Sequence, residues 1–110
     1  MKTLDSATLA EITRRLVAEC QPELIILFGS HAWGTPHASS DVDLLIIVPH
    51  SDLPPLERAV QARRCLRGLG VSKDVIVKTR AELEQARIIR SSLEYAALRQ
   101  GKVLYERGAA

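Results

Sequence analysis

The chain has 110 residues, of which 46% are apolar and 25% are charged, and its formal net charge is +2. This length suits one compact domain, so we expect residues 1–110 to form a single domain with one core. No apolar run approaches the roughly 18 residues that a membrane helix needs, and the charged N-terminal stretch has no apolar signal core. We therefore expect a cytoplasmic protein that does not associate with membranes.

The charge is divided unevenly along the chain. Residues 1–54 carry three basic and seven acidic side chains, whereas residues 55–110 carry twelve basic and six acidic ones. A nucleic-acid-binding surface would combine a dominant Lys/Arg face with interleaved aromatics, but the chain has only one Phe, one Trp and two Tyr. Direct sequence-specific binding of nucleic acid is not expected. Cys20 and Cys65 are predicted to be reduced, mostly buried thiols.

The first half of the chain predicts a helix followed by two buried strands. Apolar residues recur at helical spacing over 6–20, after a possible cap at Ser6. The apolar run 24–28 is too short for a free-standing helix and indicates a buried strand, while 29–40 is rich in turn formers. Residues 41–48 are apolar and β-branched up to Pro49, which predicts a second strand that is buried on both faces.

A second helix is predicted to begin near Pro55, with Gly70 as its left-handed stop, and a third strand over 73–78. The expected apolar stripe of this helix is Leu56, Ala59, Ala62, Leu66 and Leu69.

Thr79 and Glu82 form a capping box that predicts a last helix, which Gly101 ends, and 102–106 adds a short final strand. The face expected to be buried on this helix is Leu83, Ala86, Ile89, Leu93 and Ala97. The order helix, strand, loop, strand, helix, strand, helix, with the short final strand, indicates an α/β (α+β) fold with a small, largely buried sheet.

The chemistry of the chain is concentrated at the start of the second predicted strand. Asp41 and Asp43 are separated by one residue, so both carboxylates project from the same face of the strand. Two anions held this close repel each other, and a divalent cation between them removes the repulsion. Oxygen ligands favour Mg²⁺ or Mn²⁺ over zinc.

Two further features extend this pattern. Asp74 begins the third strand, and it joins the pair if the two strands are neighbours that run the same way. Three carboxylates are enough to hold two metal ions, the arrangement that supports displacement at phosphorus. Gly29 and Ser30 end the first strand, where a glycine permits close approach of a phosphate and the following amides and hydroxyl donate hydrogen bonds to it.

Other patterns in the sequence carry weaker signals. A lone Asp-x-Asp or Gly-Ser is usually turn chemistry or solvated charge. Gly29 and Gly34 have the glycine spacing of a P-loop but lack its lysine. His31 and His37 are expected to be exposed loop residues, and the histidines lack zinc-ligand spacing. A basic group on the second helix is expected to be a solvated face, with docking of an acidic partner as the alternative: Arg58, Arg63, Arg64 and Arg67.

The segment LFGSHAWGTPHASSDVDLLIIV, with KDVIV downstream, resembles the polymerase beta-like nucleotidyltransferase superfamily, and most closely its minimal nucleotidyltransferase branch of MntA-type antitoxins. The resemblance implies that Gly29 and Ser30 bind nucleotide phosphates and that Asp41, Asp43 and Asp74 hold two Mg²⁺ ions, or Mn²⁺. It also implies that Asp74 helps to activate the acceptor hydroxyl. The fold that it implies is a small mixed sheet flanked by helices. Trp33 stands where relatives often carry Arg, and we expect it to pack against the sheet or stack on a base.

The same resemblance implies transfer of AMP from ATP to a tyrosine hydroxyl of a HEPN-type toxin ribonuclease, with this chain as the antitoxin of the pair. The small size of the chain favours a partner that supplies the acceptor. Two alternatives remain open at this point: a binding-only antitoxin that masks its partner, and a subunit that transfers a nucleotide to a small molecule such as an antibiotic.

Overall fold

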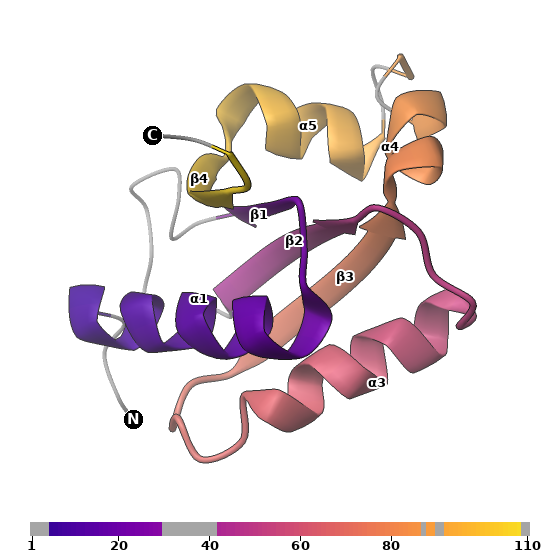
Figure 1. The fold of residues 1–110 in the computed structure, drawn as a ribbon. Helices are drawn as coiled ribbons and strands as arrows, with labels where there is room; N and C mark the ends of the chain where they lie inside the picture. The colour runs from indigo at the N-terminus through magenta and orange to yellow at the C-terminus, as the bar shows by residue number, and fades with distance from the viewer. Residues whose placement is uncertain (1–4, 30–41, 87, 90–91, 109–110) are drawn as a thin grey trace.

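The computed structural model describes residues 5–29, 42–86, 88–89 and 92–108. Figure 1 shows the elements, which are α1 Ser6–Cys20, β1 Leu24–Phe28, β2 Val42–Val48, α3 Pro55–Cys65, β3 Lys73–Thr79, α4 Arg80–Ala86, α5 Leu93–Gln100 and β4 Lys102–Glu106. The predicted α+β class is confirmed, as are the strands over 24–28 and 102–106. No helix in the described part of the chain is long and apolar enough to cross a membrane.

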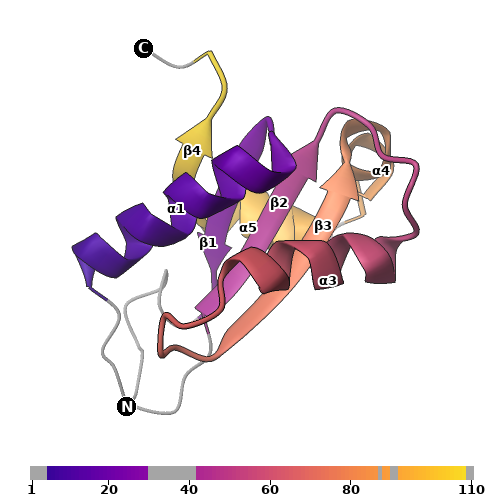
Figure 2. The same ribbon diagram turned by 60° about the horizontal axis from the view of Figure 1, so that its bottom comes forward.

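The sheet is mixed, with the strand order β3-β2-β1-β4. β2 and β3 are parallel, whereas β1 is antiparallel to both of its neighbours, β2 and β4. Helices α1 and α3 cover one face of the sheet, and α4 and α5 cover the other (Figures 1 and 2). The two central strands therefore lie between two helical layers.

The alternation of side chains in β2 supplies both layers of the core. Val42, Leu44 and Ile46 belong to the apolar cluster with α1 and α3. Leu45 and Ile47 point the other way, into the cluster that includes α4 and α5. The prediction of a strand buried on both faces is confirmed. A one-residue shift of this strand would exchange the two sets, so the pattern also specifies its register.

Helix α1 confirms the prediction for residues 6–20, but its cap is not Ser6. The N-cap is Asp5, whose Oδ1 accepts a hydrogen bond of 2.7 Å from the Thr8 amide. Ser6 is the first helical residue. Both residue types suit an N-cap, and the carboxylate one position earlier takes the role.

Helix α3 departs from its predicted stripe. Ala62, Leu66 and Leu69 are buried as expected, but Leu56 is 75% exposed. The helix ends at Cys65, well before Gly70, although Gly70 does have a positive φ. The buried side of the first turns is instead provided by an arginine, Arg58, which is only 8% exposed. The expectation that Arg58 belongs to a solvated face is therefore wrong.

Arg58 is buried because its guanidinium joins α3 to the junction of β3 and α4. It donates hydrogen bonds to the carbonyls of Leu53 and Val77 and, at 2.7 Å, to Oε1 of Glu82. The same Oε1 accepts a bond of 2.8 Å from the Thr79 amide, and Thr79 Oγ1 accepts one from the Glu82 amide. This reciprocal pair confirms the predicted capping box. A sequence shows the box but not the distant arginine that completes it.

The single helix predicted from Thr79 to Gly101 is wrong, because two helices occupy this stretch. α4 ends at Ala86 and α5 begins at Leu93. Ser92 separates them: its Oγ donates to the Ala86 carbonyl and accepts from the Tyr95 amide as the N-cap of α5. Leu83 and Ala97 are buried as predicted, whereas Ile89 is 54% and Leu93 39% exposed. The apolar residues keep helical spacing on both sides of Ser92, so the spacing alone does not show that this serine caps a new helix.

Replacing Glu82 with glutamine tests this junction through its pH dependence. Hydrogen bonding from the Thr79 amide, followed by the Arg58 guanidinium, lowers the pKa of Glu82 below its ordinary value of 4.5. A lowered pKa in the folded state adds stability that is complete above pH 4.5 and is lost as the pH falls through the folded pKa. At pH 7, Glu82→Gln should reduce the free energy of unfolding by about 1 kcal/mol, a modest value because the carboxylate is partly exposed.

The difference between Glu82→Gln and the wild type should shrink as the pH falls below 4.5, as measured by urea unfolding at a series of pH values. Glu84→Gln, whose exposed carboxylate pairs with Arg80 at 3.5 Å, is the matched control. A pH-independent difference for Glu82→Gln would contradict the assignment.

Candidate active site

Two aspartates lie side by side near the starts of β2 and β3. In the parallel register of these strands, Asp43 pairs with Asp74. The ladder begins just before them, where the Val42 amide donates to the Ser72 carbonyl at 2.8 Å. Because neighbouring strands lie about 4.8 Å apart and paired residues share a face, the two carboxylates lie within reach of one cation. The sequence predicts that Asp74 joins the pair only if the second and third strands are parallel neighbours, and β2 and β3 are.

Both aspartates lie on the face of the sheet that carries α4 and α5. Asp43 alternates with Val42 and Leu44 and shares its face with Leu45, which packs in the α4–α5 cluster. Asp43 is partly buried and Asp74 is exposed. A carboxylate that is anchored at the end of an apolar strand and still open to solvent can contact a ligand without first being uncovered.

Gly29 comes against the same carboxylate from the end of β1. Phe28 pairs with Asp43 across the antiparallel β1–β2 ladder, and Gly29 follows it with φ +78°. A Cβ at this position would overlap the Asp43 carboxylate, with Oδ2 nearest. Glycine is therefore required here both for the left-handed backbone and for the space beside Asp43.

The donor chemistry fits a hard divalent cation, because two carboxylates belong to paired residues at one end of the sheet, and Gly29 has no side chain to displace one of them. Within the described residues, no group of three His, Cys, Asp or Glu side chains is placed to hold a metal ion. The expected third ligand, Asp41, and the expected phosphate-binding Ser30 lie outside the described residues. Three other loop residues lie there too: His31, Trp33 and His37.

The sequence of residues 7–98 matches the family model of the nucleotidyltransferase domain. The chain belongs to the nucleotidyltransferase domain family. It is an enzyme of this kind, which confirms the family expected from the Gly-Ser and Asp-x-Asp motifs. No curated protein resembles the nucleotidyltransferase chain closely enough to count as a relative.

Solved structures share the fold of this nucleotidyltransferase. A toxin–antitoxin complex crystallised with AMP-PNP is 24% identical over 91% of this chain and 74% of its own, with a TM-score of 0.67. An MntA–HpeT toxin–antitoxin mutant, in which two aspartates two positions apart are glutamates, is 22% identical over 91% and 74%, with a TM-score of 0.64. A putative nucleotidyltransferase from Sulfolobus solfataricus is 21% identical over 97% and 93%, with a TM-score of 0.63. At these identities the likeness establishes the fold.

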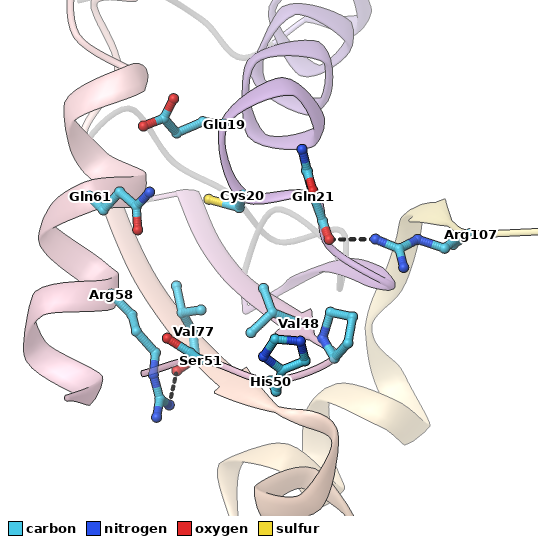
Figure 3. Close-up of a pocket in the computed structure, with 11 residues that line it drawn as sticks. Glu19, Cys20, Gln21, Val48, His50, Ser51, Arg58, Gln61, Val77 and Arg107 are labelled. Carbon is cyan, nitrogen blue, oxygen red and sulfur yellow. Dashed lines mark hydrogen bonds between the residues drawn. The ribbon is translucent and has the colours of Figure 1, made fainter. Parts of the chain in front are cut away.

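A hollow of about 360 Å³ lies at the opposite end of β2, beside Val48 and His50 (Figure 3). Two arginines line it, but both guanidinium groups already have partners. Arg58 bonds to Val77, Leu53 and Glu82, and Arg107 bonds to the Gln21 carbonyl. This hollow lies at the other end of β2 from Gly29, Asp43 and Asp74, so it is not part of the candidate site.

Cys20 lines the same hollow, and it is a free thiol, as is Cys65. Burial, with smaller contributions from Cys65 and Glu19, raises the pKa of Cys20 to about 11. No disulfide joins Cys20 and Cys65, and both side chains are only partly buried rather than mostly buried as predicted. A thiol with a raised pKa is a poor nucleophile at neutral pH, so Cys20 is not a candidate for the chemistry.

Gly29→Ala tests whether the space beside Asp43 matters for activity. The new methyl group must displace the Asp43 carboxylate, so we expect nucleotidyl-transfer activity to fall by at least tenfold, about 1.4 kcal/mol or more in the transition state. Gly68→Ala is the matched control, because Gly68 has a similar φ of +84° but nothing within 4 Å of its added Cβ.

Both alanine variants should lose stability in thermal melts, on the order of 1 kcal/mol from backbone strain, and displacement of Asp43 adds to the loss in Gly29→Ala. Only Gly29→Ala should lose activity. Equal activities in the two variants would show that the contact with Asp43 has no catalytic consequence.

Proposed function

We propose that this nucleotidyltransferase transfers AMP from ATP to a tyrosine hydroxyl of a partner protein, a HEPN-type toxin ribonuclease, and thereby acts as the antitoxin of the pair. The observation that carries the proposal is the pairing of Asp43 with Asp74 at the end of the sheet where β1 finishes in Gly29. Family membership supplies the class of reaction. The structures of similar fold include toxin–antitoxin complexes, one of them with AMP-PNP, which supports an adenine nucleotide and a protein partner.

In this proposal the tyrosine oxygen attacks the α-phosphorus of ATP, and the bond from that phosphorus to the leaving pyrophosphate breaks. Asp74, which is exposed at the start of β3, accepts the hydroxyl proton and so activates the acceptor. Gly29 and Ser30 bind the phosphates through their backbone amides and the Ser30 hydroxyl. The product is an AMP-tyrosine phosphodiester, and pyrophosphate is released.

Asp41, Asp43 and Asp74 would hold the two Mg²⁺ ions of this reaction, with Mn²⁺ as a substitute. When bound, such ions neutralise the charge that develops on the phosphates and lower the pKa of the acceptor hydroxyl. Asp43 and Asp74 would hold these ions from the second positions of β2 and β3, which are neighbouring strands of the sheet. The exposure of Asp74 leaves the site accessible to a large acceptor.

Asp43→Asn and Asp74→Asn test the proposal directly. Each should reduce AMP transfer at least a hundredfold, because an amide neither balances a divalent cation nor accepts the proton. The chain is incubated with ATP, Mg²⁺ and the purified product of the adjoining gene, and the intact mass of that protein is measured. Asp52→Asn, at an exposed aspartate before α3, is the matched control and should retain full transfer.

The mass of the partner also separates the alternatives. One or more AMP units on a tyrosine support the proposal. A tight complex with an unmodified partner would instead show an antitoxin that acts by masking. Transfer to an aminoalcohol antibiotic, with no labelled protein, would show a small-molecule nucleotidyltransferase.

A further inference from the structure

The outer side of α3 carries exposed aliphatic side chains followed by arginines. Leu56 is 75% exposed and Val60, one turn later, is 42% exposed. Arg63 and Arg64 follow at the next helical interval, and Arg67 continues the same side in the turn after the helix; all three are exposed. The opposite side of α3 packs on the sheet through Ala62 and Leu66. One side of the helix therefore belongs to the core, and the other is open.

The basic end of this surface is hollowed. An open depression of about 450 Å³ is lined by Val60, Arg63, Arg64, Arg67 and Lys73. Among the described residues, no acidic side chain lines it. Within the described part of the chain, none of these four cations forms an ion pair; the Lys73 ammonium donates only to the Val71 carbonyl, at 2.9 Å. Four positively charged side chains thus line one hollow, and none of them pairs with a carboxylate of the described residues.

The depression adjoins the candidate active site across a single strand. Lys73 precedes Asp74 at the start of β3, and alternation places their side chains on opposite faces of the sheet. β3 is an edge strand, so no further strand lies beyond it in the described sheet. In Figure 2, α3 runs beside β3 with its C-terminal end toward the start of that strand. A molecule seated on the depression therefore needs to pass only the edge of β3 to reach Asp74.

We propose that the outer side of α3 and the depression lined by Arg63, Arg64, Arg67 and Lys73 form the docking surface for the acceptor protein, which meets it with acidic side chains beside an apolar contact. This inference rests on the proposed function. The charge of the depression selects an acidic partner. Leu56 and Val60 favour a protein over a nucleic acid, because a phosphate backbone gains nothing from exposed aliphatic groups. In addition, none of the described residues that line the depression is an aromatic residue that could stack on a base.

Arg63 and Arg64 also lie in the last turn of α3, where positive charge stabilises the helix end. That role concerns folding alone and extends neither to Arg67 nor to Lys73. A test must therefore measure binding separately from stability.

The test uses the full chain and the purified product of the adjoining gene, with affinity measured by isothermal titration calorimetry. The triple variant Arg63→Gln/Arg64→Gln/Arg67→Gln should raise the Kd at least tenfold, and Leu56→Ser/Val60→Ser should also weaken binding. The wild-type Kd should rise about tenfold between 50 and 500 mM NaCl, because salt screens these charges, and the triple variant should lose most of this dependence. A control with Arg14→Gln/Arg99→Gln/Arg107→Gln removes the same charge from other surfaces and should bind like the wild type.

Binding and AMP labelling are read separately, so the two proposals fail differently. Asp43→Asn should bind the partner normally and label it poorly. The arginine triple variant should label the partner at saturating concentration but require more of it. A wild-type complex without labelling would overturn the proposed function. Unchanged affinity in the triple variant, or no wild-type complex, would overturn the docking surface. Wild-type binding of a 20-nucleotide RNA that the triple variant loses would also overturn it, in favour of a nucleic acid.

Discussion

The parallel pairing of β2 with β3 is the constraint on which the rest of the structure depends. It places Asp43 opposite Asp74, and the antiparallel β1–β2 ladder brings Gly29 against the same carboxylate. Burial of β2 on both faces holds this register, since a shift by one residue would exchange the side chains that pack in the two layers of the core and move Asp43 to the other face. The repulsion between the two carboxylates is thus imposed by the core. The packed sheet keeps the two groups from moving apart, so a bound cation, whose positive charge offsets both carboxylates, can relieve the repulsion.

Much of the fold follows from local sequence signals. The strand with Leu44 and Leu45, the capping box of Thr79 and Glu82, and the start of α1 are specified by residues close to one another in the chain. One error arises where a distant contact decides: Arg58 is buried because Glu82, twenty-four positions away, pairs with its guanidinium. The others are local. Asp5 rather than Ser6 caps α1, and the helix after β3 breaks at Ser92, which bonds to Ala86 and Tyr95.

The candidate site was predictable for a different reason. Asp43 and Asp74 head apolar strands, and a strand that is buried on both faces has few places for a charged side chain other than its ends. Whether those ends lie side by side depends on the order and direction of the strands, which the sequence pattern alone does not determine. The cationic depression could not be predicted in the same way. Lys73 lies in β3 and Arg67 follows α3, and only the packing of the helix on the strand brings them to one hollow.

In the proposed function, the two faces of β3 have different roles. Asp74, on one face, belongs to the chemistry, and Lys73, on the other, belongs to the recognition of an acidic partner. This arrangement lets a small domain act on a macromolecule without enclosing it. Exposed cations near a cluster of carboxylates also keep the anionic site from repelling an acidic acceptor.

The central claim is that the end of the sheet formed by Asp43 and Asp74 holds divalent cations for nucleotide transfer. It is tested most directly by growing crystals of the full chain with Mn²⁺ and AMP-PNP and measuring anomalous diffraction from the manganese. The account predicts anomalous peaks in coordination contact with the carboxylates of Asp43 and Asp74, with the nucleotide phosphates against Gly29. Manganese bound elsewhere while these carboxylates contact only solvent would contradict it.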